Sequence, residues 1–421
     1  MYLVARRTAS MAISKQSAGV AAAMTGMLAS AFAMNMQLIA QGWLIYEMTS
    51  SALNLTWVTL SFMLPQVIFS LPGGVLADRL RKKPVIMWAP AGNALVTLVM
   101  AVIIITGRVT FWDFIWVGFF NGTIMALSIP ARTAFIPEIV GERLIFNAMA
   151  FNTAAWNLAR ILGPALAGFM IAMFAGGDTT SVFGVGLVYF VLSALYLISA
   201  ITVLRIDHPG EPTPGQKNKP LNDVLEGLTY VIRSPVVGGL ILLSIMPFLF
   251  GLSINTLLPA FNTDVLSGGP DDLGLLMTAM GVGAIAGSLI LANLGGLRKK
   301  GYWLLVTGSV WGVAITLFAL SSSYPFAMLC IGLVGFISAV NMSMNRSIVQ
   351  LQVSQEMRGR IMSIDMMSHG LMPLGIIPIG YIAETVSVQA GLATSGVILA
   401  VITILLGIYM PKVRAIDTGF G

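Results

Sequence analysis

The feature that most constrains this chain is a series of long stretches without a charged side chain. A helix rises 1.5 Å per residue, so about 20 apolar residues are enough to cross the hydrocarbon core of a bilayer. Two of the stretches contain one charge each, and one is long enough for two spans, so together they predict twelve membrane-spanning helices. The stretches are 16–46, 48–77, 84–107, 114–131, 144–177, 179–204, 234–263, 273–297, 301–345 (divided at 321–325), 361–383 and 385–411.

The spans are expected to be α-helical, because a segment in hydrocarbon must satisfy its own backbone N–H and C=O groups. Short alternating strands, which would indicate a β-barrel, are not seen. Hydrophobic residues make up 57% of the chain and charged residues only 10%. This balance excludes a soluble enzyme, a disordered protein and a nucleic-acid binder. The fold class is therefore an all-α integral membrane protein with twelve transmembrane helices.

The placement of Lys and Arg predicts the orientation in the membrane. The formal net charge is +6, with 23 Lys and Arg residues. All of them except Arg108 and Arg160 fall in the tails and loops of one side when the spans are threaded alternately. Because positive residues concentrate in cytoplasmic loops, that side is cytoplasmic and both termini lie on it. The expected location is the cell membrane, the cytoplasmic membrane in a prokaryote.

The spans form two sets of six. We predict an N-terminal six-helix bundle over 1–204, a cytoplasmic linker over 205–234 and a C-terminal six-helix bundle over 235–421. The basic run at 81–83 recurs at 298–300, at the same place in the order of six spans. Six spans return the chain to its starting side, so the two bundles are expected to be parallel, pseudo-symmetric repeats. Such repeats form transporters with a substrate site at their interface.

Residues 220–233 of the linker have apolar side chains at helical spacing. The pattern predicts a short amphipathic helix along the cytoplasmic surface. In the spans, the Gly pairs 283/287 and 118/122 put bare backbone on one helix face and predict close helix contacts.

Three motifs resemble the major facilitator superfamily. Residues 74–83, Gly-Val-Leu-Ala-Asp-Arg-Leu-Arg-Lys-Lys, are similar to its signature loop, with Arg81 in place of a Gly. Residues 157–168 and 358–363 resemble the branch that contains the enterobactin exporter and macrolide-efflux-type proteins. The resemblance covers essentially the whole chain. It implies the two-bundle fold and transport of a small molecule by alternating access.

The signature loop implies a conformational latch. In the resemblance, the carboxylate of Asp78 faces the N-terminus of span 11, at 357–360, where unpaired N–H groups favour a negative charge. The alternative is that Asp78 is a solvated loop charge. The latch residues implied are Gly74, Asp78, Arg79, Lys82 and Lys83.

Polar and aromatic residues near the middle of spans are the candidates for substrate binding. Arg160 is the one basic residue within a span, where a charge is expensive, so it either holds an anionic group or caps carbonyls structurally. For each neutral residue the alternative role is an interhelical hydrogen bond. The candidates are Asn35, Gln41, Gln66, Asn121, Trp156, Asn157, Arg160, Asn255, Trp311 and Asn341.

Asp365 is the one acidic residue clearly within a span, and His369 follows one helical turn later. An acid and a His at this spacing can carry and release protons, since His titrates near neutral pH. The alternative is a local hydrogen-bonded pair near the helix entrance. Asp365 and His369 are therefore the candidates for proton coupling.

No phosphate-binding loop occurs in the sequence, and two His with one Cys make no convincing metal site. We therefore expect no cofactor, no ATP hydrolysis and no enzymatic activity. The leading prediction is a monomeric secondary active transporter that exports a small, drug-like or siderophore-like organic molecule in exchange for protons. An importer or uniporter is the alternative within transport, and a membrane enzyme or sensor is disfavoured.

Overall fold

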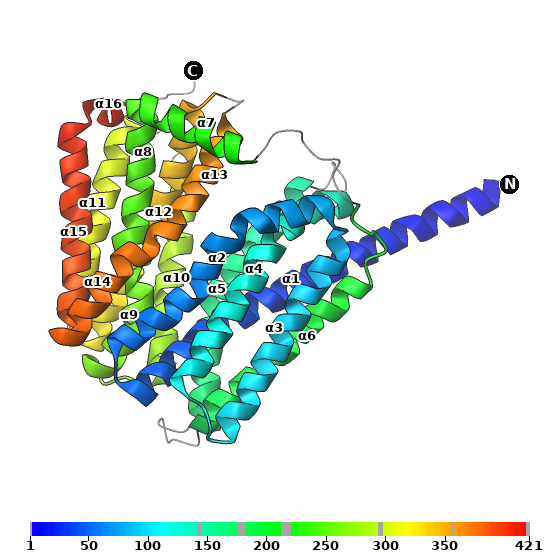
Figure 1. The fold of residues 1–421 in the computed structure, drawn as a ribbon, viewed down its shortest axis with the longest axis horizontal. Helices are drawn as coiled ribbons and strands as arrows, with labels where there is room; N and C mark the ends of the chain where they lie inside the picture. Colours follow the sequence, from blue (N-terminus) through cyan, green and yellow to red (C-terminus); the bar gives the residue numbers. More distant parts are fainter. Residues whose placement is uncertain are drawn as a thin grey trace. The chain divides into compact units, whose positions relative to one another are not determined.

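A computed structural model describes residues 2–140, 145–175, 182–211, 220–293, 298–354 and 357–417. Within these ranges every regular element is a helix (Figure 1). The chain divides into two compact units. Unit 1 comprises residues 1–44 and 60–216, and unit 2 comprises residues 45–59 and 217–421.

Two helices belong partly to each unit. Helix α1 covers Tyr2–Thr49 and helix α2 covers Ala52–Arg79. The corner between them, residues 45–59, belongs to unit 2, while the rest of both helices belongs to unit 1. Ser50 has a φ of 46° and lets the chain reverse there.

The remaining helices of unit 1 lie side by side (Figure 1), and α3 packs closely against both α4 and α6. Ile86 on α3 joins Ala131 and Phe135 on α4 in a buried apolar cluster. The helices are α3 (Lys82–Ile105), α4 (Phe111–Val140), α5 (Ile145–Phe174) and α6 (Val182–Leu204).

Unit 2 is a bundle with two interrupted spans. The first joins α8 and α9 through a short π-helix, η2, and the second joins α13 and α14 through a 3₁₀-helix, η3. The elements are α7 (Pro220–Arg233), α8 (Pro235–Met246), η2 (Pro247–Gly251), α9 (Ser253–Asp264), α10 (Pro270–Asn293), α11 (Lys300–Ala319), α12 (Tyr324–Gln352), α13 (Arg358–Ser368), η3 (His369–Leu371), α14 (Met372–Thr385), α15 (Val388–Tyr409) and α16 (Pro411–Arg414).

The twelve-span prediction is confirmed. Eleven stretches among the described residues are long and apolar enough to cross a membrane, with α8, η2 and α9 together forming one of them. The twelfth is the broken helix α13–η3–α14, whose two parts are 11 and 14 residues long. A proline lies at each break: Pro247 is the first residue of η2 and Pro373 the second residue of α14, and proline lacks the N–H that would continue the α-helix.

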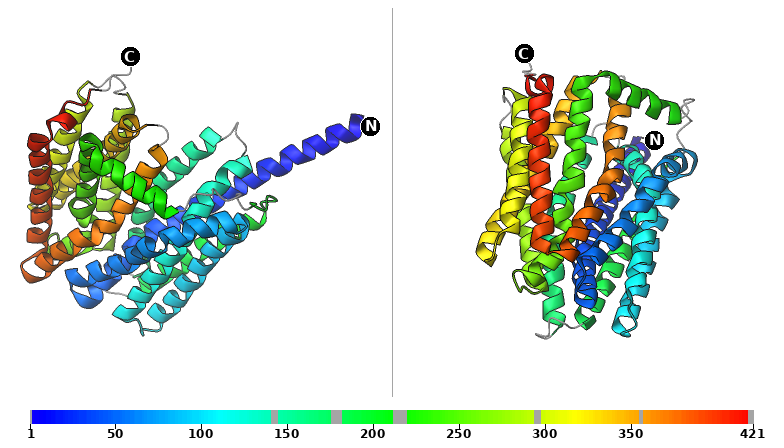
Figure 2. Two further views of the ribbon diagram at one scale, coloured as in Figure 1. Left: turned by 45° about the horizontal axis from the view of Figure 1, so that its top comes forward. Right: turned by 60° about the vertical axis from the view of Figure 1, so that its left-hand side comes forward.

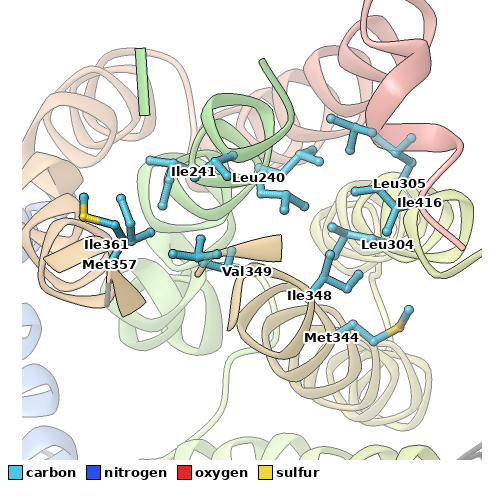
Figure 3. Packing of buried hydrophobic residues seen from close by; sticks show 14 residues of the cluster. Leu240, Ile241, Leu304, Leu305, Met344, Ile348, Val349, Met357, Ile361 and Ile416 are labelled. Atoms are coloured by element: carbon cyan, nitrogen blue, oxygen red, sulfur yellow. The ribbon is translucent and has the colours of Figure 1, made fainter. Parts of the chain in front are cut away.

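The core of unit 2 lies between α8, α11, α12 and α13. Figure 3 shows Leu240 of α8 between Ile361 of α13 on one side and Leu304 of α11 and Ile348 of α12 on the other, all in one buried cluster. Each of these four side chains is at most 1% exposed. This cluster anchors α13 and therefore fixes the position of the residues that follow Ile361.

Glycine allows the closest helix contacts in both units. A Cβ at Gly283 on α10 would lie 2.0 Å from the Gly332 carbonyl oxygen on α12, and one at Gly122 on α4 would lie 2.1 Å from the Phe62 carbonyl oxygen on α2. The predicted role of the glycine pairs in close packing is confirmed, since no side chain would fit at these distances.

Candidate functional site

Asp365 lies on α13, two turns from its start, and its side chain is only 2% exposed. The Ser244 hydroxyl on α8 donates a hydrogen bond to Asp365 Oδ1. A carboxylate buried among spans needs such donors, because taking the charge out of water is costly unless it is paired or neutralised by a proton. Asp365 is therefore a buried carboxylate that a hydroxyl of a neighbouring helix holds in place.

An ion pair joins the start of α13 to α7. Arg360, five residues before Asp365, forms an ion pair with Glu226 of α7 at 2.7 Å. Helix α8, which supplies Ser244, carries no charged residue. The α8 side of the carboxylate therefore provides a hydroxyl and apolar packing rather than a second charge.

His369 falls where α13 gives way to η3. The sequence prediction assumed a continuous α-helix from Asp365, in which the two residues share a face. The change of helix type begins at His369, and its side chain lies outside the described residues. The pairing of Asp365 with His369 stays a prediction.

At the end of unit 2 away from α7, acidic side chains form hydrogen bonds with the α1–α2 corner (Figure 1). Glu384 of α14 accepts hydrogen bonds from the Ser51 hydroxyl at 3.0 Å and from the Leu53 backbone N–H at 3.2 Å. Ser51 in turn caps α2, accepting from the backbone N–H of Asn54 at 3.1 Å. The carboxylate thus sits at a helix N-terminus, where unpaired N–H groups and the helix dipole favour a negative charge.

A second carboxylate, that of Asp264, also contacts the α1–α2 corner. The Tyr46 hydroxyl on α1 donates a hydrogen bond to Asp264 Oδ2 at the end of α9. Close packing continues along α2, where a Cβ on Gly380 would lie 2.2 Å from the Thr56 hydroxyl oxygen. Residues 45–59, together with Asp264 and Glu384, form what we call the corner clasp.

Some of the unit 1 candidates for substrate binding already form hydrogen bonds within their own helix. The Asn35 amide donates to the Ala31 carbonyl at 2.8 Å, and the Gln66 amide donates to the Phe62 carbonyl at 3.2 Å. Asn35 also abuts Gly163 of α5, where an added Cβ would lie 2.9 Å from Asn35 Cβ. Asn121 is buried, and its Oδ1 has no hydrogen-bond partner among the described residues.

Gln41 on α1 and Trp156 and Asn157 on α5 are half-buried, and Arg160 on α5 is exposed. Asn157 and Arg160 are three residues apart, so they occupy neighbouring positions on one side of α5. These residues keep free surface for a solute or for lipid, and their substrate role stays a prediction.

The unit 2 candidates differ from one another. Asn255 on α9 is half-buried. Trp311 on α11 is 1% exposed and packs on Gly251 of η2, with no hydrogen-bond partner for Nε1 among the described residues. Asn341 on α12 is buried and donates to the Leu304 carbonyl and the Thr307 hydroxyl of α11, both at 2.9 Å. Asn341 therefore ties two helices together, the alternative role considered for such residues.

The signature loop makes contacts inside unit 1. Lys82 is 1% exposed; its amino group pairs with Glu138 at the end of α4 and donates to the Glu211 carbonyl at 2.7 Å. Lys83 donates to the Ile206 carbonyl at 2.5 Å. The two lysines thus hold the segment 206–211 against α3 and α4.

The latch prediction itself depends on Asp78. Gly74 and Asp78 belong to α2, but the surroundings of both residues lie outside what the structure describes. Arg79 is exposed at the end of that helix. The contact between Asp78 and the start of span 11 therefore stays a prediction, separate from the lysine contacts.

Sequence reasoning missed several of these contacts. Tyr46, Asp264 and Glu384 all stand at the ends of charge-free stretches, and this position was read only as a span boundary. Ser244 gave no signal, since an isolated Ser in an apolar run is common in membrane helices. Among the described residues, no group of three or more His, Cys, Asp or Glu could hold a metal ion.

Comparison with solved structures shows the fold. A nucleoside transporter, NupG, superposes with a TM-score of 0.71 at 15% identity, covering 94% of this chain and 98% of its own. A bacterial homologue of the human lysosomal transporter Spinster, described as inward-facing and unoccupied, has a TM-score of 0.71 at 12% identity, with 95% and 96% covered. Both likenesses support the twelve-helix, two-bundle arrangement of the major facilitator fold.

Sequence comparison narrows the assignment from a fold to a family. The enterobactin exporter EntS of Shigella boydii serotype 18 is 27% identical over 290 residues, which are 69% of this chain and 67% of the relative. EntS of Escherichia coli O1:K1 gives the same figures. A family model described as transmembrane secretion effector matches residues 18–419. The chain therefore belongs to the transmembrane secretion effector family of the major facilitator superfamily and is a multi-pass membrane transporter.

Proposed function

We propose that this transporter exports a small organic molecule of the siderophore or drug-like class in exchange for protons. The observation that carries the proposal is the match to enterobactin exporters over two thirds of the chain, together with a buried carboxylate at Asp365. The family match supports transport, and the name of the relatives supports the outward direction and a siderophore-like substrate.

The proposed coupling step is proton binding at Asp365. When ionised, the carboxylate accepts from Ser244; when protonated, it loses its charge and the cost of burial falls. A change of charge inside a packed bundle favours different helix arrangements, so protonation can shift the population of transport states. His369 is the proposed partner in releasing the proton.

Alternating access requires that the ends of the spans separate in turn. The corner clasp is the contact proposed to open on the side opposite α7, because it combines carboxylates with a helix N-terminus and two hydroxyl donors. The contact between Asp78 and the start of span 11 is proposed to open in the same way on the α7 side. The positive-inside pattern supports placing α7 and both termini in the cytoplasm, and the chain is proposed to act as a monomer.

The test is transport by the purified protein in proteoliposomes. A thermal-shift screen of enterobactin and of macrolide-like compounds would first identify a ligand, since a ligand that binds the folded state raises its apparent stability. Uptake of that ligand would then be measured with the vesicle lumen more acidic than the outside, with no gradient, and with the gradient reversed.

Proton exchange predicts uptake when the lumen is acidic, because protons leave as the substrate enters. Uptake only when the outside is acidic would overturn export and favour an importer. Uptake that ignores the gradient would favour a uniporter. Asp365→Asn is expected to lose the response to the gradient, and Asp417→Asn, which changes an acid near the C-terminus, is the matched control.

A further inference from the structure

Helix α7 has an exposed apolar ridge. Leu225, Leu228 and Ile232 are 54%, 45% and 74% exposed. Their spacing of three and four residues places them on one face of the helix. Transport by the helix bundles does not call for such a ridge, and a connecting segment in water would be expected to carry polar side chains here.

The other sides of α7 are different. Gly227 packs on Ile364 of α13, where an added Cβ would lie 2.8 Å from Ile364 Cδ1. Tyr230 and Val231 pack on the buried cluster of unit 2. Glu226 pairs with Arg360 at 2.7 Å, and Arg233 is exposed. The helix therefore has a protein-facing side, a charged side and the apolar ridge.

The position of α7 relative to the spans is tightly limited. Only Ser234, which caps α8, separates α7 from the membrane span that begins at Pro235. In Figures 1 and 2, α7 runs across the ends of α8 and α13 rather than alongside them. Since these helices cross the bilayer, a helix lying across their ends follows the plane of the membrane surface.

We propose that α7 is a membrane-surface helix whose ridge of Leu225, Leu228 and Ile232 inserts among the acyl chains just below the phospholipid headgroups. A helix with one apolar face and one charged face binds at this depth, because both faces then meet a suitable medium. Lipid is the occupant that the position favours, since the adjoining membrane span also exposes apolar side chains such as Leu242, which is 41% exposed.

The contacts of α7 give the proposal a consequence. Glu226 and Gly227 join α7 to the first turns of α13, the helix that carries Asp365. A helix held at the bilayer surface would therefore hold the start of α13 at a fixed depth.

The experiment uses the single cysteine of the chain, Cys330, which is buried. In a Cys330→Ala background, Leu225→Cys, Ile232→Cys and Arg233→Cys would each be labelled with a nitroxide in the full-length protein. The variants would be reconstituted in vesicles of phosphatidylethanolamine and phosphatidylglycerol. Power saturation would then measure collision with oxygen, which concentrates in the bilayer, and with a water-soluble nickel chelate.

For the labels at 225 and 232, the ratio of oxygen collisions to nickel collisions is expected to be several times higher than for the label at 233. Position 233, next to Ile232, is the matched control. Equal nickel access at 232 and 233 would overturn the proposal, because the ridge would then face water. Protection of 225 and 232 from both reagents would also overturn it, because the ridge would then be covered by protein. If one ridge variant fails to fold, the other gives the same readout.

Discussion

The Glu384 carboxylate of α14 accepts a hydrogen bond from the Ser51 hydroxyl at 3.0 Å, although the two residues are far apart in the sequence. Glu384 stands in the last turn of its own helix, where the helix dipole disfavours a negative charge. At the N-terminus of α2 the same dipole effect favours it. The N-terminus of α2 therefore favours this charge only while the corner clasp is closed.

We expect Glu384→Gln to weaken the corner clasp by about 1 kcal/mol, because an amide forms weaker hydrogen bonds than a carboxylate and carries no charge for the helix dipole. This corresponds to roughly a fivefold larger open population. Thr256, which is buried and lies 3.5 Å from Thr59 of the corner, can report the opening. In a Cys330→Ala background, Thr256→Cys should react about fivefold faster with a water-soluble thiol reagent in the Glu384→Gln variant.

Glu47→Gln is the matched control for this change, since Glu47 lies in the same corner and loses the same charge. Its labelling rate should equal that of the parent. A Glu384→Gln variant with unchanged labelling would show that Glu384 does not hold the corner closed.

Ser244→Ala tests the proposed proton-coupling site by removing the hydroxyl that donates a hydrogen bond to Asp365. Removing the hydroxyl takes away the hydrogen bond that α8 donates to Asp365, so the buried carboxylate loses a partner. Gradient-driven exchange should therefore slow several-fold in Ser244→Ala. Ser199→Ala, which removes a buried hydroxyl in unit 1, should leave the exchange rate unchanged. The same exchange rate in all three proteins would separate Ser244 from coupling.

Much of the fold follows from the sequence, because the length of an apolar stretch and the spacing of its charges are local properties. The helix predicted at 220–233 has those bounds in the structure. The break of span 11 was not predicted, although Gly370 and Pro373 could have signalled it. Helix α1 begins at Tyr2 rather than near residue 16, since charge marks where a membrane span ends and does not by itself end a helix.

The candidate site was less predictable. Asp365 could be recognised because a single acid in a span is conspicuous. The ends of the spans could not be paired with one another, since the contacts of Tyr46 and Glu384 depend on how distant helices pack. Lys82 was interpreted from its motif, and its burial against Glu138 and the segment 206–211 depends on a part of the chain far away in sequence.

Lys82→Met should destabilise the protein by about 3 kcal/mol, since breaking a buried ion pair leaves the remaining carboxylate poorly compensated. Glu138 is 29% exposed, which keeps the expected cost at the lower end of the range for such pairs. The measurement is thermal unfolding in detergent, followed by tryptophan fluorescence.

Arg81→Met, which changes an exposed residue next to Lys82, is the control and should unfold at the parent temperature. Equal melting temperatures for Lys82→Met and Arg81→Met would mean that the ion pair adds no net stability.

The contact between α10 and α12 offers a test in which the two variants carry the same substitution on one helix. A Cβ on Gly335 would lie 1.9 Å from the Met280 carbonyl oxygen, whereas one on Gly332 would have its nearest neighbour, the Ala279 carbonyl oxygen, at 3.6 Å. Backbone cannot move aside as a flexible side chain does, so Gly335→Ala should force the two helices apart at a cost of about 2 kcal/mol. Gly332→Ala fits as it stands and gains slightly from the higher helix propensity of Ala. Thermal unfolding in detergent should therefore show a clear loss for Gly335→Ala and none for Gly332→Ala, and an equal response of the two variants would contradict the close approach of α10 and α12.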